Sequence, residues 1–258
     1  MREAELRYHS AKLLLRRLHR KIYVARSPEG ERVLVKENAN ILEARREMRV
    51  MKAYGRAEHL VELLGYEERD GKAFIVMEWV PGKTLNDLIR KHGKLPVDRV
   101  LAIAAQILQG VDVLHRLGYV HGDLHGGNVM VTSLKDPRVK LIDMQMAADK
   151  GRTGRAKARR RVVSPPAHLA PESGGTWIDD RYDIYGVGFM MACMMSGKVL
   201  KKPLNCRNVG PAGTASPLWE VVCRAVESDP SKRYPSAAHM AAALHSAWRQ
   251  VALRWGAC

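Results

Sequence analysis

Cysteine is scarce in this sequence of 258 residues, and no cysteine lies in a metal-binding or disulfide pattern. The chain has no Cys-x-x-Cys pair and no cysteine at metal-ligand spacing from a histidine; its four cysteines are Cys193, Cys206, Cys223 and Cys258. This argues against a zinc site and a disulfide framework, and it fits a reducing compartment.

Long hydrophobic runs are also missing. The longest apolar stretch, residues 184–195, is too short to span a bilayer. Residues 1–12 carry charges where a signal peptide needs an apolar core. We therefore expect a cytoplasmic protein without a transmembrane segment. Because 46% of its residues are hydrophobic and Gly and Pro are not clustered, we expect it to fold.

Acidic residues are few relative to basic ones, with 27 Asp and Glu against 43 Lys and Arg and a formal charge of +16. Such a surface either serves solubility or attracts anionic partners, and charge alone does not choose between nucleic acid, acidic lipid and phosphorylated glycans. We find no nucleic-acid-binding motif and no indication of an oligomeric state. Seven basic residues fall in segment 150–161, which is either a solvated loop or a docking strip for an acidic substrate.

The first third of the chain predicts a sheet with one helix. Two alternating segments, KIYVA and RVLVK, flank a turn in which Gly30 takes a positive φ. Residues 40–54 have helical spacing, with Asn40 as a cap and Gly55 as a stop. Two further strands flank the turn at residues 69–72.

After Pro81-Gly82 the periodicity becomes helical. Strands followed by helices indicate an α+β, bilobal fold with a cleft between the lobes. We predict an N-lobe at 1–80, with an antiparallel sheet and one helix, and a mainly helical C-lobe at 81–258. The predicted long helices span about 97–117, 181–196, 217–227 and 235–252.

The segment HGDLHGGNVM at 121–130 carries most of the chemistry, together with the aspartate after the apolar strand 139–142. Phosphoryl transfer requires a divalent metal over the phosphates and a group that accepts the proton of the attacking hydroxyl. The carboxylates of Asp123 and Asp143 and the amide oxygen of Asn128 suit these tasks. We expect the three side chains to converge around one cation.

In this order, the motifs resemble those of the protein-kinase-like superfamily over roughly residues 20–240. HGDLHGGNVM resembles the catalytic loop, and Asp143-Met-Gln takes the place of the metal-binding Asp-Phe-Gly. The resemblance implies use of ATP and Mg²⁺, with Asp123 as the catalytic base. It also implies that Asn128, a further catalytic-loop residue, and Asp143 bind the metal.

The resemblance extends to the nucleotide site. VLVK resembles the third strand, whose lysine is drawn to the α- and β-phosphates, and a helix carboxylate, Glu47 or else Glu43, is expected to pair with it. Met77 to Val80 resemble the hinge that holds adenine. The predicted ATP-binding residues are Lys36, Glu47, Met77, Glu78, Val80 and Met130.

Four residues have structural roles by the same resemblance. Ala170-Pro-Glu matches the end of an activation segment at 143–172, and a buried ion pair between Glu172 and Arg233 is implied. Asp183 is expected to hydrogen-bond the backbone of the catalytic loop, which begins at His121.

The chain departs from the family pattern at its phosphate-covering loop. Residues 15–21 contain no glycine, so backbone N–H groups are not free to cradle phosphates as they are in that loop. One interpretation is that Arg16, Arg17, Arg20 or Lys21 supplies the charge; the other is a pseudokinase. Leu34 stands where the family has a small alanine, which narrows the predicted adenine pocket.

Further departures lie near the catalytic loop. Gly122 replaces an arginine that senses a phosphorylated activation segment, and His125 replaces a lysine that neutralises the γ-phosphate. Pro165 replaces a threonine, and Met144-Gln145 replaces Phe-Gly. Three hypotheses follow: an atypical serine/threonine protein kinase acting on protein substrates, a pseudokinase scaffold with weak or no turnover, and a small-molecule or glycan kinase.

Overall fold

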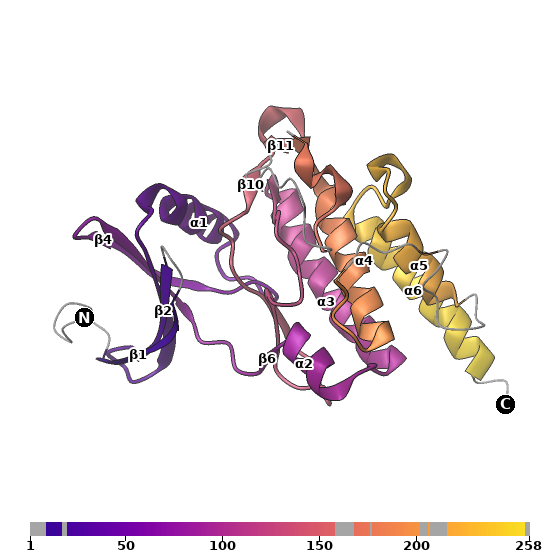
Figure 1. Cartoon of the computed structure of the whole chain (residues 1–258), viewed down its shortest axis with the longest axis horizontal. Helices are drawn as coiled ribbons and strands as arrows, with labels where there is room; N and C mark the ends of the chain where they lie inside the picture. The colour runs from indigo at the N-terminus through magenta and orange to yellow at the C-terminus, as the bar shows by residue number, and fades with distance from the viewer. Residues whose placement is uncertain are drawn as a thin grey trace.

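A computed structural model describes residues 9–16, 20–157, 168–175, 177–201, 206 and 216–255. A sheet part, made of β1 to β5 and α1, is followed by a helical part that contains α2 to α6 (Figure 1). The α+β architecture predicted from the sequence is confirmed. The division at residues 80 and 81 stays a prediction.

The sheet is antiparallel, with the strand order β1-β2-β3-β5-β4. Both predicted turns are confirmed: Gly30 has a φ of +87°, and Asp70 and Gly71 have φ values of +52° and +71°. The strands are β1 (His9–Arg16), β2 (Arg20–Arg26), β3 (Arg32–Asn38), β4 (Leu63–Arg69) and β5 (Lys72–Glu78).

β1 was not predicted as a strand. Its three consecutive leucines do not alternate in polarity, and Leu14 is 60% exposed at the edge of the sheet. The pairing of β1 with β2 is also irregular, with two register shifts. An edge strand with exposed apolar residues lacks the period-two pattern by which strands are recognised.

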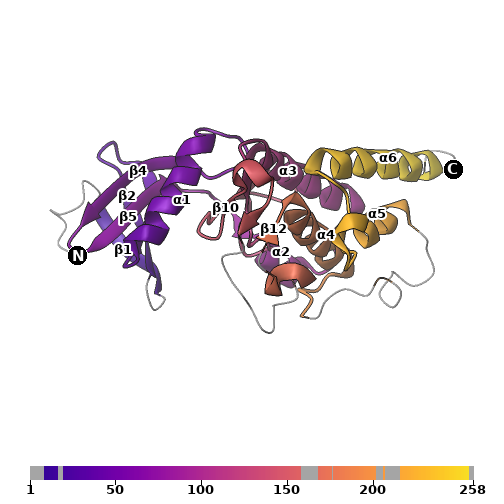
Figure 2. The ribbon, with the colours of Figure 1, turned by 90° about the horizontal axis from the view of Figure 1, so that it is seen from above.

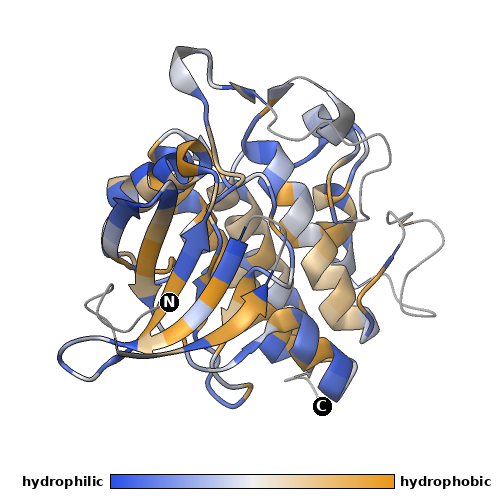
Figure 3. Ribbon diagram, turned by 60° about the vertical axis from the view of Figure 1, so that its left-hand side comes forward, coloured by the Kyte–Doolittle hydropathy of each residue, from blue (hydrophilic) through white to orange (hydrophobic). Residues whose placement is uncertain are grey.

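Alternation along β3 gives the sheet two different faces. Val33 and Val35 pack with Phe74 and Val76 in a small outer core. The alternate residues of β3, Leu34 and Lys36, face the other side of the sheet, toward the helical part. Figure 3 shows apolar residues along the middle of the strands and polar ones in the turns.

Helix α1 (Ile41–Tyr54) begins and ends as predicted. The side chain of Asn40 accepts a hydrogen bond from the N–H of Glu43, and Gly55 closes the helix with a φ of +58°. Ala44, Val50 and Met51 bury one face. Figure 2 shows α1 between the sheet and the helical part, which is where a side chain from α1 reaches a site between them.

The helical part is built around α4, which is apolar on all sides and packs against α3, α5 and α6. Among the residues that the structure describes, no helix combines the length and apolarity needed to span a membrane. The helices are α2 (Leu85–His92), α3 (Val97–Arg116), α4 (Asp180–Ser196), α5 (Pro217–Ala225) and α6 (Ala237–Trp255), and the 3-10 turns are η1 (Gly151–Thr153), η2 (Pro171–Gly174) and η3 (Pro230–Lys232).

Short strands organise the chain between β5 and α4, and one of them, β9, joins the two parts. The N–H of Leu141 donates to the carbonyl of His59 at 2.8 Å, and the N–H of Val61 donates to that of Leu141 at 3.0 Å. The short strands form the sheets β6-β8-β9, β10-β7 and β11-β12. They are β6 (Lys83–Thr84), β7 (Tyr119–Val120), β8 (Val129–Val131), β9 (Val139–Leu141), β10 (Ala148–Asp149), β11 (Ala156–Lys157) and β12 (Trp177–Ile178).

Candidate functional site

A cavity of about 350 Å³ lies between the sheet part and the helical part. Its walls are mostly apolar, and its polar lining includes Lys36, Glu47, Asn128 and Asp143. The predicted hinge residues and Met130 line it as well. The apolar side chains that form its walls include Leu15, Ile22, Leu34, Met77, Val80 and Met130.

Lys36 connects β3 to α1 and to the segment after β9. Its Nζ lies 2.8 Å from both carboxylate oxygens of Glu47 and 2.8 Å from Oδ1 of Asp143. The Lys36 and Glu47 side chains are 3% and 1% exposed. Burial alone would lower the pKa of Lys36, but the two carboxylates outweigh it and raise that pKa, so the ammonium stays charged.

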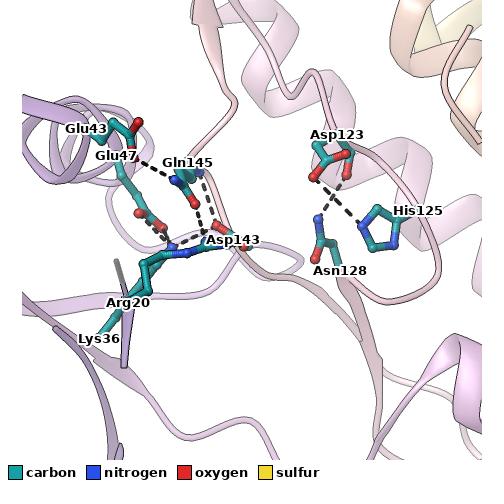
Figure 4. A network of polar contacts seen from close by, with 9 residues as sticks. All are labelled: Arg20, Lys36, Glu43, Glu47, Asp123, His125, Asn128, Asp143 and Gln145. Carbon is teal, nitrogen blue, oxygen red and sulfur yellow. Dashed lines mark hydrogen bonds and ion pairs between the residues drawn. The ribbon is translucent and has the colours of Figure 1, made fainter. Parts of the chain in front are cut away.

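Glu43, the alternative partner predicted for Lys36, contacts Gln145 instead. Its Oε2 accepts a hydrogen bond from Nε2 of Gln145 at 2.8 Å. Oε1 of the same Gln145 side chain accepts from Arg20. Gln145 therefore connects α1 to the first residue of β2 across the mouth of the site (Figure 4).

Two cationic side chains contact the carboxylate of Asp143. Besides Lys36 at Oδ1, Arg20 donates to Oδ2 at 3.3 Å. Burial raises the pKa of Asp143, but Lys36 and Arg20 lower it more, and the net pKa lies well below that of a free carboxyl. Asp143 has a φ of +68°, a conformation that non-glycine residues adopt mostly under local constraint. The carboxylate is thus fixed and ionised.

The side chain of Glu78, at the end of β5, is held by Lys140 on β9 and by the backbone just before β4. Its Oε1 accepts from Lys140 at 2.6 Å and from the N–H of Glu62 at 2.8 Å. The N–H of Glu78 donates to the carbonyl of Glu62 at 3.0 Å. These contacts fix the exit of β5 along the cavity wall.

The start of the catalytic-loop segment is fixed by Asp183 from α4. The N–H groups of His121 and Gly122 donate to its carboxylate at 2.7 and 3.0 Å, and His115 Nε2 donates at 2.9 Å. Burial raises the pKa of Asp183, but the His115 hydrogen bond and charge lower it to a net value below the usual range. Gly122 has a φ of +77°, and a Cβ there would lie 2.8 Å from the carbonyl oxygen of Met146. The backbone is therefore shaped for glycine at this position.

Two histidines flank Asp123. His168 Nε2 lies 3.6 Å from its Oδ1, and His125 Nε2 lies 3.9 Å from its Oδ2. Sequence reasoning missed His168, because a lone histidine two residues before Ala170 carries no signal of its own. Burial raises the pKa of Asp123, but the contact with His168 and the other nearby histidines lower it below its ordinary value.

His125 is oriented by the glycine that follows it. The N–H of Gly127 donates to His125 Nδ1 at 3.0 Å, so the neutral ring carries its proton on Nε2, toward Asp123. A metal-ligating histidine usually donates from its other nitrogen, so this arrangement favours a hydrogen-bond donor over a metal ligand. Burial lowers the pKa of His125, which favours the neutral ring.

Asn128 stands between Asp123 and the cavity. Its amide nitrogen donates to the backbone carbonyl of Asp123 at 3.0 Å, and Figure 4 shows its oxygen pointing away from Asp123. Asn128 and Asp143 line the same cavity, whereas Asp123 is not among the described residues that line it. Figure 4 shows the three expected side chains in two neighbouring groups: Asn128 lies with Asp123, and Asp143 lies with Lys36 and Arg20.

Behind the site, Arg233 makes a bidentate contact with Glu172. Its Nη1 and Nη2 donate to the two carboxylate oxygens at 2.6 and 2.8 Å. Arg233 also lies over the ring of Tyr185, 5.0 Å from its centroid. The end of the predicted activation segment is therefore attached to the loop after α5.

Some predicted features lie outside the described residues, namely Arg17, Pro165 and residues 158–161 of the basic segment. Within the described part of that segment, Lys150 is bound to Asp180 at 2.5 Å and to the carbonyl of His115 at 3.0 Å. Arg155 and Lys157 are exposed.

Comparison with known proteins places this geometry in a family. The family model described as "Protein kinase domain" matches residues 11–212. Serine/threonine-protein kinase PksC of Streptomyces coelicolor is 31% identical over 198 residues, which cover 68% of this chain and 35% of PksC. PknA of Corynebacterium glutamicum, also named a serine/threonine-protein kinase, is 29% identical over 209 residues, covering 73% of this chain and 43% of PknA.

A third relative, the probable serine/threonine-protein kinase zyg-1 of Caenorhabditis elegans, is 28% identical over 182 residues, covering 69% of this chain and 25% of zyg-1. The chain therefore spans less than half the length of these relatives. The family match, however, covers well over half of the chain and includes the cavity, the Lys36–Glu47 pair and the loop that carries Asp123. On these grounds, the chain belongs to the protein kinase family.

Proposed function

We propose that this chain transfers the γ-phosphoryl group of ATP to serine or threonine hydroxyls of protein substrates, as an atypical, Mg²⁺-dependent kinase. One observation carries the proposal: a buried Lys36–Glu47 pair, Asp143 and Asn128 line one largely apolar cavity, and Asn128 contacts Asp123. The similar proteins PksC and PknA are named serine/threonine-protein kinases, which supports protein substrates over a small molecule or a glycan.

The adenine base would lie in the apolar part of the cavity. Leu34 and Met130 stand on opposite walls, from β3 and β8, and Met77 lines the same space. Backbone groups of Glu78 and Val80 would hold the base, because contacts with Lys140 and Glu62 fix this strand end. Leu34 leaves a narrower slot than alanine would, and a planar ring suits a narrow apolar slot.

The residues present fit Mg²⁺ as a cofactor. Asp143 is held ionised, and the hydrogen bond from the Asn128 amide to Asp123 leaves the Asn128 oxygen available as a ligand. Asn128 and Asp143 would hold the ion. When bound, Mg²⁺ neutralises charge on the phosphate oxygens.

Asp123 would accept the proton of the attacking hydroxyl. Its lowered pKa keeps it ionised, and His125 and His168 hold its carboxylate from two sides. As the hydroxyl oxygen bonds to the γ-phosphorus, the bond to the bridging oxygen breaks, and ADP leaves with that electron pair. Lys36 would hold the α- and β-phosphates during this step.

The basic segment at 150–161 would attract an acidic stretch of the protein substrate. Among its described residues, Arg155 and Lys157 are exposed, whereas Lys150 is occupied by Asp180. The segment follows Asp143 and precedes His168, so in the chain it lies between the proposed metal ligand and a histidine that contacts the proposed base Asp123. Exposed cations near a site raise the local concentration of anionic substrates.

One observation favours the pseudokinase as a second candidate. Arg20 takes up Oδ2 of Asp143, an oxygen that a metal ion would also use. A pseudokinase would keep this contact when nucleotide is added.

Radiolabelled ATP and α-casein, incubated with the purified chain and Mg²⁺, test the proposal. Asp123→Asn should lower incorporation by at least about 100-fold, since it removes the proton acceptor. Asp112→Asn, which alters a surface ion pair with Arg116 on α3, is the matched control and should retain activity. Equal incorporation by wild type and Asp123→Asn rejects the assigned base. If Mg-ATP at millimolar concentration leaves the melting temperature unchanged, the pseudokinase is favoured.

A further inference from the structure

A residue of the glycine-free stretch before β3 contacts the residue that replaces the glycine of Asp-Phe-Gly. Arg20 lies in the glycine-free stretch before β3, and Gln145 replaces the glycine after the metal-binding aspartate. Arg20 Nη1 donates both to Gln145 Oε1 and, at 3.3 Å, to Asp143 Oδ2. The two side chains therefore meet beside Asp143, which lines the cavity, although neither of them is among the described residues that line it (Figure 4).

The two cations bound to Asp143 differ in how they are held. Lys36 is shared between Glu47 and Asp143, and its side chain is 3% exposed. Arg20 contacts one carboxylate and one neutral amide, and its side chain is 30% exposed. Arg20 is therefore less fully neutralised and freer to turn toward a ligand in the cavity.

A triphosphate in this cavity meets an unfavourable balance of charge without Arg20. Glu47, Glu78 and Asp143 are acidic and Lys36 is basic among the lining residues, and Lys140 offsets Glu78 at 2.6 Å, which leaves two carboxylates against one ammonium. In the family, backbone N–H groups of the glycine loop offset such a balance. Here Arg20 is the described residue of β2 that reaches Asp143, and a guanidinium binds phosphate oxygens through paired hydrogen bonds.

We propose that Arg20 is the phosphate-binding residue for the nucleoside triphosphate, in place of the glycine-loop amides, and that Gln145 is its positioning residue. This inference rests on the proposed nucleotide binding.

The contacts of Gln145 explain how it positions Arg20. Its Oε1 accepts from Arg20, and its Nε2 donates to Glu43 at 2.8 Å. If the Gln145 amide were flipped, its Nε2–H would face the Arg20 guanidinium and its Oε1 would face the Glu43 carboxylate. The two contacts therefore fix one orientation of the amide. Glu43 lies on α1 and is thereby tied to the same network as the Lys36 partner Glu47.

The opposite role for Arg20, a plug that keeps metal away from Asp143, predicts an effect of opposite sign. Removing a phosphate ligand weakens ATP binding, whereas removing a plug strengthens binding of Mg-ATP. The sign of one measured change therefore decides between them.

Isothermal titration of the whole chain with ATP and with adenosine, each with EDTA and with Mg²⁺, makes this measurement. Arg20→Ala should weaken ATP binding by about 10- to 100-fold, the range for a lost hydrogen bond to a charged group, and leave adenosine binding unchanged. Arg20→Lys should give an intermediate loss. Adenosine binding also reports that each variant is folded.

Lys21→Ala is the matched control. Lys21 is the next residue on β2, carries the same charge, and points to Glu37 at 3.4 Å on the other face of the sheet. Lys21→Ala should leave ATP binding within about twofold of wild type, because its side chain lies on the face of the sheet away from the cavity.

A double-mutant cycle tests Gln145. Gln145→Gly should weaken ATP binding in the wild type but not in Arg20→Ala, because a positioning residue acts through its partner. An ATP-to-adenosine affinity ratio that Arg20→Ala leaves unchanged, or stronger Mg-ATP binding by that variant, overturns this inference alone. Equal effects of Gln145→Gly in both backgrounds overturn the positioning role. Failure of wild type to bind either ligand overturns the proposed function, and this inference with it.

Discussion

The ammonium group of Lys36 on β3 lies 2.8 Å from both carboxylate oxygens of Glu47 on α1. Both side chains are buried, so each charge depends on the other. Breaking one member of such a pair leaves an uncompensated buried charge, whereas removing both charges does not.

Lys36→Met should therefore affect stability and transfer separately. The single variant should lose about 3–5 kcal/mol of unfolding free energy, and adding Glu47→Gln should recover most of this loss. Phosphoryl transfer should be absent in both variants, because neither retains the cation for the phosphates. Urea unfolding and radiolabel transfer measure the two effects. A stable Lys36→Met single variant would contradict the buried pair.

We expect His125 to assist phosphoryl transfer as a neutral ring whose Nε2–H points toward the carboxylate of Asp123. Gly127 has no Cβ, and a Cβ there would lie 2.7 Å from His125 Cε1. Gly127→Ala should therefore displace the ring and lower kcat by about 10- to 100-fold, as His125→Ala should. The double variant should lose no more than either single one. Exposed His245→Ala is the control, and additive losses would argue against a shared role.

Local features of the fold were predictable because a few adjacent residues determine them. Asn40 and Gly55 bound α1, and Gly30 and the pair Asp70-Gly71 form turns whose backbone they favour. The order of the motifs likewise placed Lys36 and the catalytic-loop segment in the family pattern.

Contacts between residues far apart in the chain were not predictable from the sequence. The sequence offered four basic candidates near the missing glycines, and only the structure places Arg20 against Asp143, 123 residues away. His168 gave no signal, because its significance comes from the approach of the segment after residue 167 to Asp123. β1 was missed because its exposed leucines hide the strand pattern.

Asp183 should give the protein a defined dependence of stability on pH. Its pKa in the folded state is lowered, so its contribution is present above the pKa of an unfolded aspartate, about 3.9, and is lost as pH falls through the folded value. Asp183→Asn should cost about 3 kcal/mol at pH 6, because the amide cannot serve three donors as a carboxylate does.

The difference between wild type and Asp183→Asn should then shrink as pH falls from 6 toward 3, as measured by urea unfolding at each pH. Asp179→Asn, at the cap of α4, is the control for a helix-end effect. A difference that stays constant across this range would show that the Asp183 charge is not what stabilises the loop.

The contact between Glu172 and Arg233 predicts a large effect far from the proposed chemistry. The Arg233 side chain is fully buried and also donates to the carbonyls of Glu227 at 2.7 Å and Arg181 at 3.0 Å. Arg233→Ala therefore leaves a carboxylate and two carbonyls without their donor, and it should cost about 3–5 kcal/mol in urea unfolding.

Exposed Lys232→Ala should change stability by less than about 0.5 kcal/mol. Arg233→Lys keeps the positive charge but lacks the planar guanidinium that bonds both carboxylate oxygens of Glu172. Compared with Arg233→Ala, it should therefore recover only part of the lost unfolding free energy. A loss below about 1 kcal/mol for Arg233→Ala would mean that this contact does not hold the segment ending at Glu172.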